Sequence, residues 1–193
     1  MRYREFGKTG CKVSALGFGA MRMPTVEKDG KKFIDEEKAI ALIRQAIDSG
    51  VNYVDTAFFY HDGESEALVG KALKDGYREK TYVATKLPMG DVKCPEDFEK
   101  LLGTQLERLD TEYIDFYLFH ALNRDHWKTV KEFGLIEKML RAKKEGKIRH
   151  IGFSFHDDLE IFETILKEFD CCEFCQIQFN YLDTDYQAGI EGL

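Results

Sequence analysis

Six polar side chains stand at or just beyond the ends of short apolar runs: Asp55, Tyr60, Lys86, His120, Ser154 and Gln176. Each alone has an ordinary explanation, because an aspartate can cap a helix, a lysine can lie in solvent and a histidine can fill a core. In α/β folds, however, active groups sit at the carboxyl ends of strands. The shared position of the six residues therefore predicts a single site.

The carboxylate, the lysine and the phenol of this set suit proton transfer to a carbonyl oxygen. A buried Lys86 needs a counter-ion, which Asp55 can supply. The ammonium group favours the phenolate form of Tyr60, so we expect the pKa of Tyr60 to lie below its usual value. Tyr60 is therefore the predicted general acid.

His120 ends an apolar run, residues 114–120, and its imidazole is expected at the same rim, where it could donate to a developing oxyanion. None of these groups supplies a hydride, so a reduction at this site implies a nicotinamide cofactor. Ser154 and Gln176 carry groups able to bind a carboxamide. Gln178 lies on the same strand face as Gln176, and spacing alone does not choose between them.

The elements that must position these residues alternate along the chain, with short apolar runs rich in β-formers between longer helical patterns. Such alternation is typical of βαβ units around a parallel sheet. The expected strands are residues 14–19, 51–55, 81–86, 114–120, 148–155 and 175–179. The expected helices are residues 35–49, capped by Asp35 and ended by Gly50, then 64–74, 95–109 with Pro95 at the first helical position, 130–145 and 159–169.

The remaining segments are expected to be short connections within one domain, residues 1–193. Residues 2–13 predict a hairpin that turns at Gly7–Gly10 and could cap an opening. The polar stretch 21–35 reads as an exposed loop with a turn at Asp29-Gly30. The tail 181–193 is expected to be the start of a further helix.

Two α/β architectures fit this alternation, a doubly wound sheet and a closed (β/α)8 TIM barrel. Gly17-Phe18-Gly19 follows a strand, but the third glycine of a dinucleotide fingerprint would fall at Arg22, and Pro24 with a loop follows in place of a helix. The barrel is therefore predicted, with only about six of its eight βα units present in this chain.

Composition excludes several classes of function. The chain has 35 acidic and 28 basic residues, a net charge of −7, and no long basic run, which argues against nucleic acid as a partner. It has no apolar run long enough for a membrane span and no secretory leader pattern. Five cysteines are an odd number and too few for a disulfide scaffold, so reduced thiols and a cytoplasmic location are expected.

The motifs at the strand ends resemble those of the aldo-keto reductases, in the family's order from about residue 2 to residue 193. They are Leu16-Gly17-Phe18-Gly19-Ala20-Met21-Arg22, Asn52-Tyr53-Val54-Asp55-Thr56-Ala57 with Tyr60, Ala84-Thr85-Lys86, the strand ending in His120, and Ile151-Gly152-Phe153-Ser154. The resemblance implies NADPH-dependent reduction of a small aldehyde or ketone by a tetrad, here Asp55, Tyr60, Lys86 and His120. It also implies NADP(H) contacts from Gly19, Ala20, Met21, Asp55, Ser154 and Gln176.

The chain departs from the family pattern in two places. Phe155 and His156 follow Ser154, where the family usually has Asn directly after the serine. The seventh and eighth strands, which in the family supply the aromatic stacked on nicotinamide and the pocket for the 2′-phosphate, are absent from this chain. We therefore expect a fragment of a longer protein, whose open barrel edges favour self-association.

Gly-Ala-Met-Arg and Gly-Phe-Ser-Phe-His further resemble the branch of the family whose longer members add a C-terminal iron-sulfur segment. Cys171-Cys172-x-x-Cys175 lacks a fourth ligand at ferredoxin spacing, so no metal is expected here. Cys11 and Cys94 are expected to be ordinary reduced thiols.

Three functional interpretations remain open at this point. The first is an oxidoreductase that moves a hydride between NADPH and an aldehyde or ketone. The second is a non-catalytic binding or regulatory subunit of the same fold, and the third is an inactive fragment with an unfinished cofactor pocket.

Overall fold

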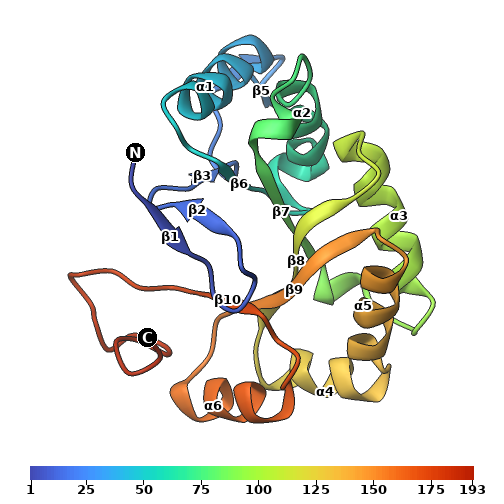
Figure 1. Ribbon diagram of the computed structural model, residues 1–193. Coiled ribbons are helices and arrows are strands. Elements are labelled where there is room, and N and C mark those ends of the chain that lie inside the picture. The colour runs from blue at the N-terminus through green and yellow to red at the C-terminus, as the bar shows by residue number, and fades with distance from the viewer.

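The computed structural model describes residues 1–193, and its centre is a curled sheet of six strands in the order β10-β9-β8-β7-β6-β3 (Figure 1). Every neighbouring pair is parallel. All the carboxyl ends of the strands therefore meet at one edge of a half-barrel, as the barrel prediction requires. The strands are β3 (Phe18–Gly19), β6 (Tyr53–Asp55), β7 (Tyr82–Leu87), β8 (Ile114–Leu122), β9 (Ile148–Phe155) and β10 (Phe174–Ile177).

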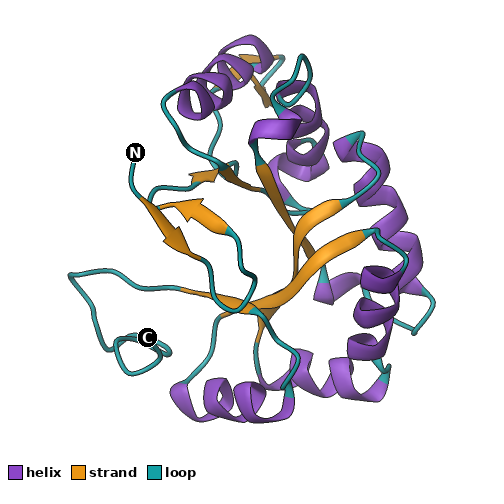
Figure 2. Cartoon of the chain, in the orientation of Figure 1, coloured by secondary structure: helices purple, strands orange, loops and turns teal.

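Helices connect these strands around the outside of the curled sheet (Figure 2). They are α1 (Glu36–Asp48), α2 (Ser65–Ala72), α3 (Asp97–Leu109), α4 (Arg124–Glu132), α5 (Leu135–Lys144) and α6 (Leu159–Glu168). The predicted cap of the first helix is confirmed, because the Asp35 side chain accepts from the Lys38 N–H. Gly70 lets α2 approach α3, since a Cβ there would lie 2.7 Å from Leu109 O.

Two helix predictions need correction. The single helix expected over residues 130–145 is two helices, separated at Gly134, whose φ of +60° suits a glycine. Pro95 does not open α3, because Glu96 occupies the cap position and Asp97 is the first helical residue.

The first predicted strand is also shorter than expected. Lys12–Ser14 forms β2, which pairs with β1 (Tyr3–Glu5), and only Phe18–Gly19 joins the main sheet. Between them Ser14 Oγ donates to Leu16 O at 2.7 Å, which turns the chain and leaves Leu16 exposed. The expected loop at 21–35 contains a second hairpin, β4 (Thr25–Lys28) with β5 (Lys31–Ile34), which turns at the predicted Asp29-Gly30.

The β1–β2 hairpin fills the half-barrel at the amino ends of its strands. The ring of Phe6 lies 5.4 Å from Tyr53 and 5.0 Å from both Phe116 and Phe174, measured between centroids. The Lys8 N–H donates to Glu173 O at 2.7 Å, which ties the hairpin to the chain just before β10. We call Phe6, Tyr53, Phe116 and Phe174 the aromatic plug.

The tail does not begin a helix, so that prediction is wrong. Residues 181–193 form turns, and Asn180 Oδ1 accepts from the N–H groups of Leu182 and Asp183. An asparagine side chain that satisfies these donors favours a turn over a helix. No helix of the chain has the length and apolar character needed to cross a membrane.

Candidate active site

The structure places all six predicted site residues at or just beyond the carboxyl edge of the sheet. Tyr60 opens a short 3₁₀ turn, Tyr60–Gly63, that follows β6. The other five lie within the last three residues of five successive strands: Asp55 in β6, Lys86 in β7, His120 in β8, Ser154 in β9 and Gln176 in β10.

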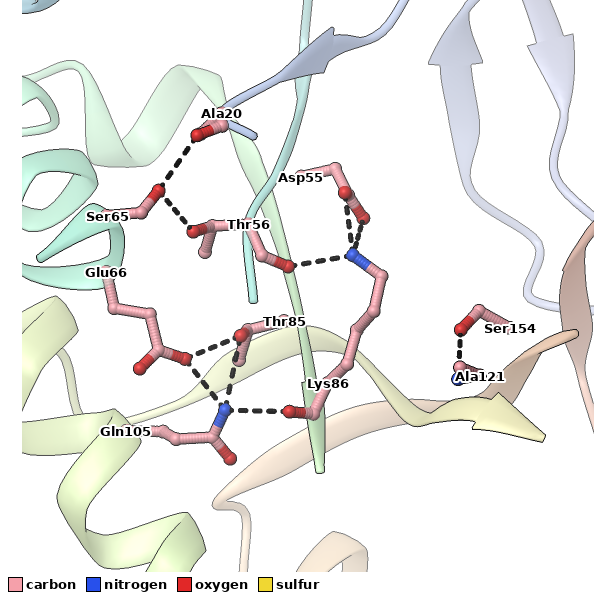
Figure 3. A network of polar contacts seen from close by, with 10 residues as sticks. All are labelled: Ala20, Asp55, Thr56, Ser65, Glu66, Thr85, Lys86, Gln105, Ala121 and Ser154. Carbon is pink, nitrogen blue, oxygen red and sulfur yellow. Dashed lines mark hydrogen bonds and ion pairs between the residues drawn. The ribbon is translucent and has the colours of Figure 1, made fainter. Parts of the chain in front are cut away.

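Lys86 and Asp55 form a buried ion pair (Figure 3). Lys86 Nζ donates to both carboxylate oxygens of Asp55 at 2.7 Å and to Thr56 O at 2.8 Å, and its side chain is 2% exposed. Burial lowers the pKa of Lys86 and raises that of Asp55, since both charged forms lose hydration, and the ion pair opposes both shifts. All three N–H donors of the ammonium group are bonded within the fold. Lys86 can therefore act on Tyr60 and His120 through its charge but not as a hydrogen-bond donor.

The Tyr60 ring lies against this pair, with its centroid 5.2 Å from Lys86 Nζ. The prediction of a lowered pKa for Tyr60 is wrong. Burial, followed by the negative charge of Asp55, raises the pKa of Tyr60 to about 12. The physical reasons are that a buried phenolate would lose its hydration and that the carboxylate of Asp55, paired with Lys86, repels a second negative charge.

His120 completes the group around the tyrosine. Its ring centroid lies 6.0 Å from that of Tyr60, in an edge-to-face arrangement. Burial and then the positive charge of Lys86 lower the pKa of His120 to about 4. The imidazole is therefore neutral near pH 7 and carries one N–H that can donate.

A buried polar network behind β7 holds the strand end that carries Lys86, and the sequence interpretation missed it (Figure 3). Glu66 Oε1 accepts from Thr85 Oγ1 at 2.6 Å and from Gln105 Nε2 at 2.7 Å, and Gln105 Nε2 also reaches Lys86 O at 3.0 Å. Arg108 lies 3.2 Å from the second carboxylate oxygen of Glu66. A signal was present, because Glu66 and Gln105 occupy the apolar faces of their helices, and a polar residue there needs a partner.

Ser154 and Gln176 lie side by side, since their Cα atoms are partners in the β9–β10 register. The Ser154 hydroxyl accepts from the Ala121 N–H at 2.7 Å, so its own proton stays available. The Gln176 side chain is on an exposed residue, whereas Gln178 lies beyond the end of β10. The register therefore favours Gln176 over Gln178 as the neighbour of Ser154.

The segment after β3 is tied to the end of β6. The Ala20 N–H donates to Asp55 O at 2.8 Å, and Ala20 O accepts from Ser65 Oγ at 3.1 Å. Ala20 is fully buried, whereas Gly19 and Met21 on either side are exposed at the edge. The exposed pair can line a ligand, while Ala20 fixes their position.

The two residues that follow Ser154 point to different surroundings. Phe155 packs on Phe162 of α6, with ring centroids 5.1 Å apart. His156 is exposed, and its Nδ1 lies 3.2 Å from Gln187 Oε1.

All five cysteines are free thiols, and no three His, Cys, Asp or Glu side chains are arranged to hold a metal ion.

A parallel half-barrel with a buried Lys–Asp pair at its carboxyl edge defines an α/β protein of the barrel class. Solved structures of the same class are similar to it. An aldo-keto reductase from Bacillus halodurans in its holo form matches with a TM-score of 0.74 and 32% identity, over 92% of this chain and 57% of that one. An aldo/keto reductase from Klebsiella pneumoniae in complex with NADP and acetate matches with a TM-score of 0.68 and 27% identity, over 91% of this chain and 57% of that one.

The chain belongs to the aldo/keto reductase family, whose sequence model matches residues 15–191. Among the curated relatives, probable aldo-keto reductase 1 of Glycine max is 36% identical over 158 residues, which is 78% of this chain and 44% of that protein. The chain spans about half the length of the curated relatives that it matches.

Proposed function

We propose that this chain carries the reacting groups of an oxidoreductase that moves a hydride between NADPH and an aldehyde or ketone. The observation that carries the proposal is the buried Lys86–Asp55 pair, with its ammonium group 5.2 Å from the ring centroid of Tyr60, at the carboxyl edge of a family half-barrel. Family membership makes this chemistry the expected one.

Tyr60 is the proposed general acid. With a pKa of about 12, the free phenol keeps its proton at neutral pH and is ready to donate it. The carbonyl oxygen becomes an alkoxide as the reduction proceeds, and an alkoxide is a far stronger base than a phenolate.

His120 is the proposed hydrogen-bond donor to the carbonyl oxygen. Because its pKa is lowered to about 4, the neutral imidazole polarises the carbonyl without competing with Tyr60 as a proton source. Asp55 holds Lys86 in place and sets the charge of the pair.

The residues at the edge fit a nicotinamide. Ser154 keeps a hydroxyl proton free beside the exposed Gln176 amide, a combination that can bind a carboxamide. Gly19, Met21 and Asp55 would line the same side of the site, and the fully buried Ala20 would hold Gly19 and Met21 in place. When bound, the nicotinamide would supply the hydride, and NADP is the form bound in the Klebsiella pneumoniae relative.

Substitution of Tyr60 tests this function. Tyr60→Phe removes the only proton that the proposal donates, so turnover of NADPH with an aldehyde panel should fall by about 10²–10⁴-fold while NADPH affinity is kept. Tyr181→Phe, at an exposed tyrosine of the tail, is the matched control. An unchanged rate in Tyr60→Phe would remove Tyr60 from the mechanism.

Four further expectations stay predictions. Self-association through the free edges of β3 and β10 should appear as a concentration-dependent mass in light scattering. Membership of the iron-sulfur branch should appear as iron bound to the protein from its own source. A longer parent chain should appear as a larger intact mass of that protein. The cytoplasmic location is tested by cell fractionation.

A further inference from the structure

A second group of reactive side chains lies at the amino edge of the sheet, opposite the Lys86 pair. Cys11 directly precedes β2, His150 is the third residue of β9, and Glu173 directly precedes β10. The reductase chemistry proposed above uses none of them. His150 and Glu173 are close because β9 and β10 pair in the sheet, and the β1–β2 hairpin places Cys11 beside them.

The three side chains form a chain of contacts. His150 Nε2 lies 3.4 Å from Cys11 Sγ, and His150 Nδ1 lies 2.8 Å from Glu173 Oε1. An ionised carboxylate can only accept, so Nδ1 carries the proton. In the neutral imidazole, Nε2 therefore presents its lone pair to the thiol. This is the arrangement of a nucleophile, a base and a group that orients the base.

The base is held in a fixed position. Glu173 Oε2 accepts from Lys143 Nζ at 2.6 Å and from the Ile151 N–H at 3.0 Å. Burial alone would raise the pKa of Glu173, but its hydrogen bonds to Lys143 and His150 outweigh this, and the net pKa is lowered. The imidazole also stacks on Phe116 of the aromatic plug, with ring centroids 5.3 Å apart. Glu173 therefore stays ionised, and the ring cannot turn away from the thiol.

The other four cysteines lie in surroundings that disfavour a thiolate. A hydrogen bond with the Glu96 carboxylate raises the pKa of Cys94, and burial raises the pKa of Cys171 and of Cys175. Burial raises the pKa of Cys172 to about 12. Cys94 and Cys11 are both half-buried. The two thiols thus differ in their partner, because Cys11 contacts an imidazole and Cys94 does not.

We propose that Cys11, with His150 as its base and Glu173 as the orienting group, is a nucleophilic thiol site that takes a small uncharged peroxide. The Cys11 proton passes to His150 Nε2, and the sulfur attacks one peroxide oxygen. The S–O bond forms as the O–O bond breaks, and the departing oxygen takes the proton from the imidazolium. The sulfur is oxidised to a sulfenic acid, and hydrogen peroxide is reduced to water.

The test exposes the 193-residue chain to limiting hydrogen peroxide in the presence of dimedone and measures the adduct at each cysteine by peptide mass spectrometry. We expect the Cys11 adduct to form about ten-fold faster than the Cys94 adduct, because Cys11 contacts an imidazole that can take its proton, whereas Cys94 contacts a carboxylate that raises its pKa. His150→Gln should bring the Cys11 rate down to that of Cys94 and leave Cys94 unchanged. Lys167→Gln, at an exposed lysine of α6 that pairs with Glu163, serves as the control variant.

Two results would overturn the proposal. One is a Cys11 rate in the unaltered chain that is equal to or below that of Cys94, which requires no variant to fold. The other is a Cys11 rate that His150→Gln leaves unchanged while the variant keeps the circular dichroism spectrum of the parent chain.

Discussion

The two edges of the half-barrel are built from the same strands and are chemically opposite. Alternate residues of a strand face the same side, so β7 presents Tyr82 at its amino end and Lys86 near its carboxyl end. In the same way, β8 presents Phe116 and then His120. At the amino edge, Phe116 is part of the aromatic plug and Tyr82 packs on Phe116, with ring centroids 5.5 Å apart, whereas the carboxyl edge gains a charge from Lys86 and a hydrogen-bond donor from His120. Residues an even number of positions apart in one strand face the same side. The same strand can therefore supply a packed ring at one edge of the sheet and a polar site residue at the other.

The difference between the edges is also one of energetics. The aromatic plug is stabilised by apolar burial, which does not depend on charge. The carboxyl edge depends on pairing two buried charges, and such a pair is costly to break. Substitutions at the two edges should therefore differ in size, in pH dependence and in their effect on activity.

The largest effect is expected from Lys86→Met. It leaves Asp55 buried without a counter-ion, so the free energy of unfolding should fall by about 3–5 kcal/mol in urea denaturation. Lys71→Met is the matched control, because Lys71 pairs with Glu36 at the surface with both side chains more than half exposed. The control should change stability by less than about 1 kcal/mol. Equal effects of the two variants would mean that the carboxyl edge is not set by charge pairing.

The next effect is a pH dependence at the carboxyl edge. The pKa of His120 is about 4 in the folded chain, below its ordinary value of 6.5, so the unfolded chain binds this proton more readily. The contribution of His120 is present above pH 6.5 and is lost as the pH falls through about 4, and it amounts to about 3 kcal/mol. His120→Gln should remove that part of the acid sensitivity in a pH series of urea denaturations, whereas His156→Gln, at an exposed histidine, should not. Identical pH profiles for the parent chain and His120→Gln would contradict the shift.

The smallest effect is expected at the aromatic plug. Phe6→Ala removes a half-buried ring from contact with Tyr53, Phe116 and Phe174, so stability should fall by about 2 kcal/mol, less than for a fully buried ring. The loss should be the same at pH 5 and pH 8. Phe33→Ala, at an exposed phenylalanine of β5, should cost less than half as much. A loss that grows with acid would show that the two edges are coupled.

The parallel half-barrel and its strand ends were predictable because buried strands read as apolar runs that end in polar residues. The same reading missed the break at Gly134, because the apolar pattern continues across both helices. It also predicted one continuous strand over residues 14–19, because the turn at Leu16 leaves no mark in the apolar pattern. The turns of the tail were missed because they depend on hydrogen bonds from backbone N–H groups to the Asn180 side chain. Hydrophobic periodicity does not report such local contacts.

The candidate site was predictable as a set of residues but not in its electrostatics. Residue types and spacing indicate that Asp55, Lys86 and Tyr60 meet. They do not reveal that Asp55 engages the ammonium with both oxygens, or how deeply the phenol is buried, and these two facts reverse the expected pKa shift. The network of Glu66 and Gln105 depends likewise on which helix faces meet, which a single sequence does not state.

A titration of Tyr60 itself is the most direct measurement of whether the carboxyl edge stores a proton for donation. Carbon-13 NMR of ring-labelled tyrosine, with Tyr60 assigned through Tyr60→Phe, reports the ionisation of that one phenol. We expect a pKa of about 12, and a lower value in Asp55→Asn, where the charge of Lys86 is no longer neutralised. A Tyr60 that ionises at or below the ordinary value of 10, or one that Asp55→Asn leaves unchanged, would contradict a site built on the Lys86–Asp55 pair.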